Sequence, residues 1–143
     1  VDITRLDKIT SRKHASKEPG YSDFYLNLNR HPESNKLLRS TNEEAVKRSI
    51  RQLLLTKKGE RLYNPSFGGS LEQYLFEDIS PSTSQSIKEG IEYAINTFEP
   101  RAKLIDVLVV PNDTNNSYEI GIYFEVINSV TPVSLAITLY RVR

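Results

Sequence analysis

The sequence contains no cysteine and no tryptophan, and its two histidines are His14 and His31. Without cysteine the chain can form no disulfide bond, no thiolate zinc site and no cysteine nucleophile. Two histidines are too few for a histidine-rich metal site. A serine triad would need one of them beside a serine and a carboxylate. We expect both to lie at the surface, and we expect no cofactor and no metal.

The chain also lacks long apolar runs and any excess of one charge. No apolar stretch approaches the roughly 20 residues of a membrane-spanning helix. The first residues, Val1 to Thr4, do not have the basic-then-apolar pattern of a secretory signal. The 19 basic and 18 acidic residues give a net charge of +1, whereas nucleic-acid-binding domains usually carry a clear basic excess. We therefore expect neither a membrane nor a nucleic acid as partner.

Basic residues gather near the N-terminus, where one acid, Asp7, accompanies them. They are Arg5, Lys8, Arg12, Lys13, His14 and Lys17. The simpler interpretation is a solvated, extended arm, and the alternative is an arm that docks on an acidic neighbour. Glu18-Pro19-Gly20 predicts a turn at its end. A short strand is then expected over 24–28, followed by a polar loop over 31–40.

The first helix is predicted to begin at Thr41. Thr41 and Glu44 have the spacing of a capping box, in which each side chain bonds the other residue's backbone. One apolar stripe follows, consisting of Val46, Ile50, Leu53 and Leu54. Lys57 and Lys58 suit the negative end of the helix dipole. Gly59 suits the left-handed residue that ends a helix.

A loop is expected over 60–69, because it contains a proline and two glycines. Tyr63 and Phe67 are predicted to hold this loop against the core. Ser70 is predicted to cap a short helix over 71–76. Its inward residues should be Leu71, Tyr74 and Leu75.

A second long helix is predicted to begin at Ser80-Pro81, since proline is well tolerated at the first helical position. Its core stripe comprises Ile87, Ile91, Ala94, Ile95 and Phe98. Pro100 ends it, because the residue before a proline avoids helical geometry.

The last third of the chain predicts three strands, over 104–110, 118–127 and 133–142. The second and third alternate apolar and polar residues, and the connections are short enough for hairpins. The expected fold is α+β, with two main helices and a short one packed on a three-stranded antiparallel β-meander. An extended N-terminal arm precedes it. We predict residues 1–40 as arm and loop, and residues 41–143 as the domain.

Catalytic motifs are weak in this sequence. Gly68-Gly69 lacks the lysine and the serine or threonine of a phosphate-binding loop. Glu77, Asp78 and Glu99 are the acids that a glycosidase-like pair would use, and such a pair must lie about 5–10 Å apart. Asp78 is more simply explained as a turn residue, and no tryptophan is present to stack on a sugar. We expect no enzyme activity.

Glu99-Pro100-Arg101 is the most informative tripeptide, because proline fixes the backbone between the last predicted helix and the first strand. One interpretation is a local ion pair that braces this corner. The other is a rigid polar site whose guanidinium binds a partner's carboxylates or carbonyl groups. The residues favour neither interpretation over the other.

Four short motifs in register resemble a known family. They are Leu55-Thr56-Lys57-Lys58-Gly59-Glu60-Arg61, Pro65-Ser66-Phe67-Gly68, Leu75-Phe76-Glu77 and Glu99-Pro100-Arg101. The pattern is similar to that of the small, lysozyme-like baseplate wedge proteins of contractile-tailed phages. Those proteins are related to a baseplate subunit of type VI secretion. Each motif alone is weak, but their common order over residues 41–110 is specific.

The resemblance implies a structural protein of the virion tail, assembled in the host cytoplasm. It implies that Glu99, Pro100 and Arg101 bind the helical core bundle of the baseplate wedge. It also implies that the C-terminal sheet accepts strands of the tail sheath protein and so initiates the sheath. The residues assigned to that strand pairing are Val133, Leu135, Ile137, Leu139 and Arg141. The N-terminal arm would contact the tail tube, the sheath or a neighbouring wedge protein.

Two alternatives stay open at this point. One is a peptidoglycan hydrolase, since the family is also associated with lysozyme activity, although these residues supply no convincing catalytic pair. The other is a baseplate subunit of a type VI secretion system or a tailocin, which the sequence does not separate from a phage protein.

Overall fold

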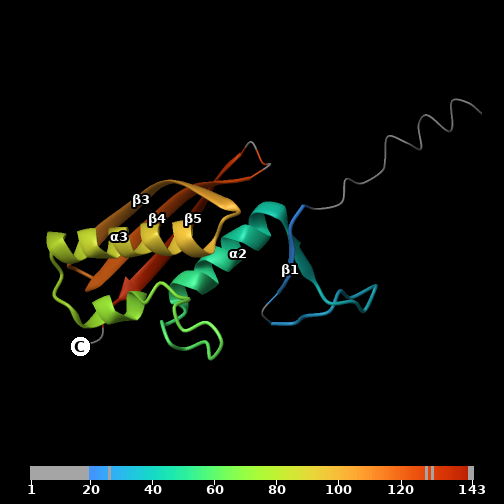
Figure 1. Cartoon of the computed structure of the whole chain (residues 1–143), viewed down its shortest axis with the longest axis horizontal. Helices are drawn as coiled ribbons and strands as arrows, with labels where there is room; N and C mark the ends of the chain where they lie inside the picture. Colours follow the sequence, from blue (N-terminus) through green and yellow to red (C-terminus); the bar gives the residue numbers. More distant parts are fainter. Residues whose placement is uncertain (1–19, 26, 128, 130, 142–143) are drawn as a thin grey trace, which may run out of the picture.

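The computed structural model describes residues 20–25, 27–127, 129 and 131–141, so the basic segment 5–17 lies outside it (Figure 1). The elements are β1 (Ser22–Phe24), β2 (Arg39–Thr41), α2 (Asn42–Leu55), the 3-10 helix η2 (Leu71–Phe76), α3 (Pro81–Phe98), β3 (Ala102–Asn112), β4 (Ser117–Val126) and β5 (Pro132–Tyr140). The strands β3, β4 and β5 form an antiparallel sheet in that order. The predicted α+β fold with a β-meander is confirmed.

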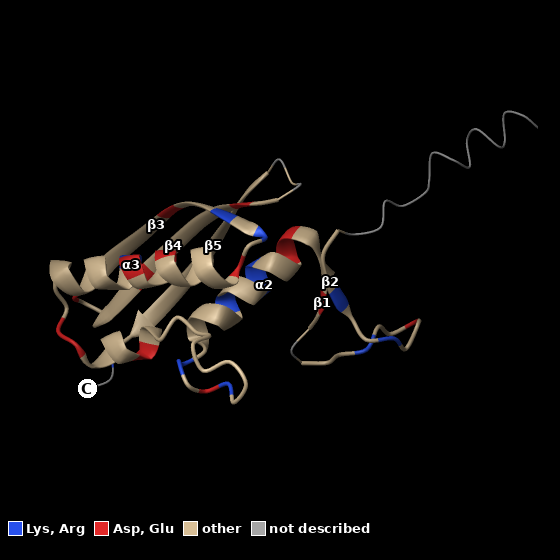
Figure 2. Ribbon diagram, viewed as in Figure 1, with Lys and Arg blue, Asp and Glu red and all other residues tan. Residues whose placement is uncertain are grey.

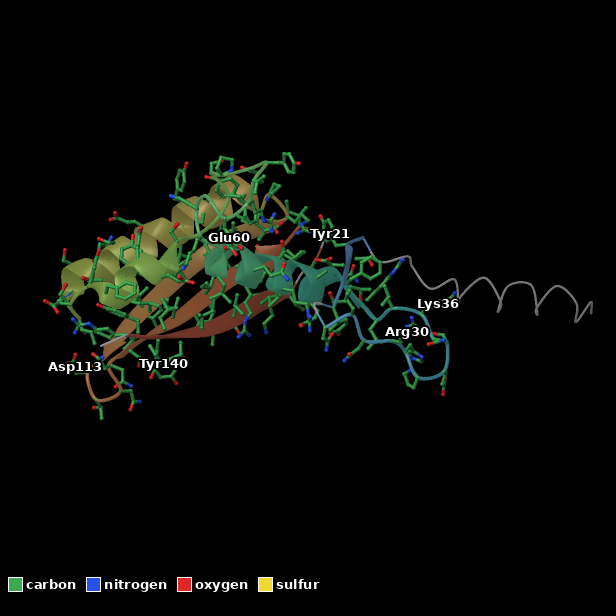
Figure 3. The ribbon with its side chains drawn as sticks, turned by 90° about the horizontal axis from the view of Figure 1, so that it is seen from below. Tyr21, Arg30, Lys36, Glu60, Asp113 and Tyr140 are labelled. Atoms are coloured by element: carbon green, nitrogen blue, oxygen red, sulfur yellow. The ribbon has the colours of Figure 1, made fainter. Side chains whose placement is uncertain are left out.

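The core lies between this sheet and the two long helices, which cover the same face (Figures 1 and 3). The central strand β4 supplies Ile120, Ile122 and Phe124, each at most 2% exposed. Both predicted helix stripes pack onto them; only Phe98 stays partly buried. Among the described residues, no helix is long and apolar enough to cross a membrane.

The start of α2 differs from the predicted capping box. Thr41 is the N-cap residue, but its side chain makes no capping hydrogen bond. Glu44 instead accepts a bond from Arg48, 3.3 Å away. β2 runs directly into the helix, and Asn42 makes the bend with a φ of 50°. The Asn42 side chain accepts a hydrogen bond from the Gly20 N–H at 3.0 Å, which fixes the bend from outside the helix.

The end of α2 also differs from the prediction. The helix ends at Leu55, so Lys57 and Lys58 lie beyond it, and Gly59 has a φ of +86° without serving as the cap. Gly68 and Gly69 cross the helix end instead, and the Gly69 N–H donates to the Leu53 carbonyl at 2.9 Å. A carbonyl in the last turn of the helix is therefore satisfied by a later segment of the chain.

One aromatic residue, and not the predicted two, holds the loop after α2 against the core. Phe67 packs edge-on against Phe98, with ring centroids 5.3 Å apart. Tyr63 is fully exposed, so its predicted anchoring role is wrong. Ser70 does not cap η2; its hydroxyl accepts a bond from the Lys58 N–H at 3.1 Å.

The start of α3 confirms the prediction. The Ser80 hydroxyl accepts a hydrogen bond from the Thr83 N–H at 3.1 Å, and Pro81 occupies the first turn. Glu99 is the C-cap residue, and Pro100 follows it. The helix thus ends at the predicted corner.

Residues 20–41 form a hairpin where a strand over 24–28 and a loop over 31–40 were expected. β1 pairs with β2 in antiparallel register, and Arg30 bridges to Leu37 farther out. β1 ends at Phe24, and Leu28 has a φ of 48°, so the backbone is not extended at the end of the expected strand. The hairpin projects from the body, with Arg30 and Lys36 toward its far end (Figure 3).

Candidate partner-binding surfaces

Glu99 and Arg101 form a bidentate ion pair at the corner between α3 and β3. Arg101 Nε donates to Glu99 Oε1 at 2.6 Å, and a terminal guanidinium nitrogen donates to Oε2 at 2.7 Å. Glu99 is only 3% exposed, whereas one third of the Arg101 side chain remains accessible. The corner therefore presents the outer side of a guanidinium whose inner side is already occupied.

The charged form of Glu99 is favoured despite its burial. Burial raises the pKa of this carboxyl, but hydrogen bonds from Arg101 and Ser49, together with the Arg101 charge, bring the pKa below its ordinary value. The pKa of Arg101 is raised, first by its hydrogen bond to Glu99. Ser49 belongs to α2, so the pair connects both helices to the sheet.

The corner is also fixed through its backbone and its neighbours. The Arg101 carbonyl accepts a hydrogen bond from the Ile127 N–H at 2.9 Å. The Arg101 guanidinium lies 5.7 Å from the centre of the Tyr21 ring. The local ion pair of the bracing interpretation is therefore present between Glu99 and Arg101. The partner-binding role of Glu99-Pro100-Arg101 stays a prediction.

The acids considered for a hydrolase do not converge. Asp78 precedes α3 and Glu99 follows it; the helix has 18 residues and is therefore about 27 Å long. Two catalytic carboxylates need about 5–10 Å. Asp78 pairs instead with Arg141 at 2.7 Å. Glu77 is adjacent to Asp78 and exposed. Among the described residues, no group of three or more acids and histidines is placed to hold a metal ion.

β5 is an edge strand, and its register with β4 shows which backbone groups face outward. The Arg141 N–H donates to the Asn116 carbonyl at 2.9 Å, so these two residues form a hydrogen-bonded pair. Hydrogen-bonded and non-bonded pairs alternate along an antiparallel ladder. The backbone groups of the even-numbered residues therefore point away from β4. Four of these residues have both an N–H and a C=O that point outward and have no strand partner in the described part of the chain: Ser134, Ala136, Thr138 and Tyr140.

Most of the residues that the sequence analysis assigned to strand pairing anchor β5 to the core and do not offer outward backbone groups. Leu135, Ile137 and Leu139 are 3–7% exposed, because their side chains belong to the core. Their backbone groups face β4. Arg141 lies just beyond β5 and pairs with Asp78. The alternation along the sequence identifies the buried face, but the direction of each backbone group depends on the register with β4, which alternation alone does not give.

The opposite edge, formed by β3, is less suited to pairing. The ladder shifts by one residue between Leu104 and Asp106, which is a β-bulge. The N–H of Val107 points outward but is bonded by the Asp106 carboxylate at 2.8 Å. Pro111 has no N–H, and Lys88 bonds Asp106 from α3 at 3.2 Å. Bulges, prolines and charges are the usual means of blocking a sheet edge.

A groove runs between α2 and β5, beside the open edge. One part has a volume of about 310 Å³ and is lined by Lys47, Arg51, Leu55 and Leu135 among others. A second part of about 480 Å³ includes Lys47 and Val133. Figure 2 shows basic positions along α2 and acidic ones at its start. The groove thus combines apolar and basic side chains with the acidic Glu43 and Glu44 at one end, next to backbone groups that have no partner among the described residues.

The position of α2 relative to β5 is fixed by Glu43. Its carboxylate accepts hydrogen bonds from Ser129 and from Thr131, the latter at 2.6 Å. These bonds hold the pKa of Glu43 below its ordinary value. The start of the helix is therefore tied to the turn that leads into β5.

Comparison with known proteins identifies the family of this chain. Residues 40–130 match the family model described as baseplate wedge protein gp25. The protein of that name from Enterobacteria phage T4 is 33% identical over 91 residues, which are 64% of this chain and 69% of the phage protein.

Two solved structures are similar over most of their length. One, from Geobacter sulfurreducens, is described as a candidate tail lysozyme; it has a TM-score of 0.66 at 30% identity and covers 73% of this chain and 95% of its own. A chain of the anti-feeding prophage baseplate has a TM-score of 0.60 at 25% identity and covers 85% of each chain. The family match spans more than half of the sequence, and the motifs lie in the expected order. The chain belongs to the baseplate wedge protein gp25 family.

Proposed function

We propose that this protein is a structural, non-enzymatic subunit of a contractile-tail baseplate wedge, located in the virion tail. It docks on the helical core bundle of the wedge through Glu99, Pro100 and Arg101. It then initiates the tail sheath by accepting a strand of the sheath protein at β5. Its other partners are neighbouring wedge proteins. The tail tube, contacted through the N-terminal arm, is a further proposed partner.

The open edge of β5 is the observation that carries this proposal. The strand is anchored to the core through its odd-numbered side chains and leaves four residues whose outward backbone groups have no strand partner in the described part of the chain. An edge of this kind pairs with an incoming strand through main-chain hydrogen bonds. The blocked β3 edge directs such pairing to β5.

Blocking the edge without touching the core tests the sheath role. Ala136→Pro removes an outward N–H, so it should leave the β4–β5 ladder intact while preventing a full set of bonds to an added strand. Sheath subunits are mixed with baseplates that carry this variant, and sheath growth is scored by electron microscopy. We expect growth to be reduced at least several-fold relative to wild type.

The matched control is Ala136→Val, which keeps the N–H at the same exposed position and suits a strand. Circular dichroism and baseplate incorporation must match wild type for both variants. Deleting β5 is a poorer test, because Leu135, Ile137 and Leu139 are core residues. Equal sheath growth on proline and valine baseplates would reject initiation at β5.

The docking role calls for a variant that does not expose the buried Glu99 carboxylate. Arg101→Lys keeps a positive charge beside Glu99 but loses the planar fork that a partner would bind. We expect incorporation into wedges to fall while the folded state persists, as measured by co-purification with wedge proteins and by thermal unfolding. Unchanged co-purification would remove Arg101 from the docking surface.

A baseplate subunit of a tailocin or a type VI secretion system is the second candidate within the same class. Similarity to the anti-feeding prophage baseplate favours keeping it. The neighbouring genes distinguish the candidates, because capsid genes accompany only a phage.

A further inference from the structure

We propose that the edge of β5 selects an incoming strand that carries acidic residues, because basic side chains of α2 lie beside the place which that strand would occupy. This inference rests on the proposed strand pairing at β5. It adds a chemical requirement on the partner that pairing through backbone groups alone does not impose.

Helix α2 presents a stripe of three side chains to the groove beside β5. Lys47, Arg51 and Leu55 are spaced at i, i+4 and i+8, so they share one face of the helix. All three line the groove together with Leu135 of β5. Leu55 is 47% exposed. Glu43 and Glu44 line the end of the groove near Val133. A strand added to β5 would therefore lie beside a surface that is acidic at this end, basic at Lys47 and Arg51, and apolar at Leu55.

The cations of this stripe have no acidic partner in the part of the chain that the structure describes. Arg48, the remaining basic residue of this groove, is used differently, since it pairs with Glu44 at 3.3 Å and lies over the Tyr25 ring at 3.8 Å. Neither Lys47 nor Arg51 takes part in an ion pair among the described residues. An added strand would bring these two charges next to a less solvated surface, which favours opposite charges on that strand.

The alternation of side chains along a strand predicts which positions of the added strand would meet α2. Successive side chains point to opposite faces, so alternate residues of the added strand would face α2. Acidic residues are expected opposite Lys47 and Arg51, and an apolar residue is expected opposite Leu55 and Leu135. The partner segment is therefore an extended one with at least two acids at alternating positions.

A second copy of β5 does not fit this pattern. The strand Pro132–Tyr140 contains no aspartate or glutamate, so pairing of two β5 edges would leave both sets of cations unmatched. The same surface that favours an acidic strand thus disfavours self-association.

The test uses the full chain, labelled with nitrogen-15, and two synthetic peptides of equal length. Both peptides carry the same valine and leucine residues, and their alternating polar positions hold glutamate in one and lysine in the other. Binding is measured by fluorescence anisotropy, and the site is located by amide shifts in NMR spectra. We expect shifts at Ser134, Ala136 and Thr138, and about tenfold tighter binding of the glutamate peptide at low salt.

The double variant Lys47→Glu/Arg51→Glu should remove or reverse this preference. Lys103→Glu, an exposed charge reversal on β3, is the matched control and should keep it. A preference that is equal in wild type and the double variant would overturn the inference, while binding at the β5 amides would leave strand pairing in place. If neither peptide shifts these amides, the proposed strand acceptance at β5 fails as well.

Discussion

Glu99 is a buried residue that contributes to stability and also holds the Arg101 side chain of the proposed docking corner. Its carboxylate is almost fully buried, and it is kept charged by two bonds from Arg101 and one from Ser49. A buried charge that loses its partner is strongly destabilising. A substitution that removes the positive charge of Arg101 therefore acts on the fold as well as on the proposed docking surface.

The lowered pKa of Glu99 makes the stability contributed by this pair depend on pH. The unfolded chain takes up the proton near the ordinary glutamate value of about 4.3, whereas the folded chain takes it up at a lower pH. The stabilisation is therefore present above that value and is lost as the pH falls through the folded pKa. Wild type should exceed Glu99→Gln by about 2 kcal/mol in the free energy of unfolding at pH 7.

This difference should shrink as the pH is lowered from 5 to 3. Urea unfolding followed by circular dichroism at several pH values measures it. Glu77→Gln removes an exposed carboxyl and controls for the loss of one negative charge. A difference between wild type and Glu99→Gln that is constant over this range would show that the Arg101 pair does not depend on Glu99 ionisation.

Among the elements, the segment after α2 depends most on close contact. A Cβ atom at Gly68 would lie 2.4 Å from the Thr56 carbonyl oxygen, and one at Gly69 would lie 2.9 Å from the Leu54 Cα. Both neighbours are backbone atoms of the helix end, which cannot move aside as a flexible side chain can. The two glycines therefore allow the chain to hydrogen-bond the last turn of α2.

Gly68→Ala should destabilise the protein more than Gly59→Ala. Both positions have a positive φ, but Gly59 has open space around its Cα. We expect a loss of about 1 kcal/mol at Gly59 from backbone strain alone, and about 3 kcal/mol at Gly68, where steric overlap is added. Chemical denaturation of the two variants measures the difference, and equal losses would mean that the loop moves away from the helix.

The elements were predictable where their pattern is local. The stripes of both long helices, the Ser80 cap and the three strands follow from spacing in the sequence. The ends of α2 were not predictable, because Gly20 and Gly69 bond them from positions 22 and 16 residues away along the chain. Tyr63 was misplaced because nothing in its neighbourhood distinguishes a buried aromatic residue from an exposed one.

For the whole molecule, the sequence motifs predicted the Glu99–Arg101 corner and the C-terminal sheet as binding surfaces. They did not predict which backbone groups and side chains of the sheet face outward. The corner is visible as a tripeptide because its contacts are local. The open edge depends on the register of β5 with β4, and the groove depends on the packing of α2 across it. The division at residue 40 stays a prediction.

The two edges of the sheet are unequal. β3 carries a bulge and a proline within the strand and has an outward N–H bonded by Asp106, whereas β5 has a proline only at its first residue, Pro132, and no bulge among the described residues. This inequality gives the subunit a polarity. Under the strand acceptance proposed for β5, each copy would seed a single row of strands, and that row would extend in one direction only. A ring of such copies would fix both the number of rows and the direction in which they grow.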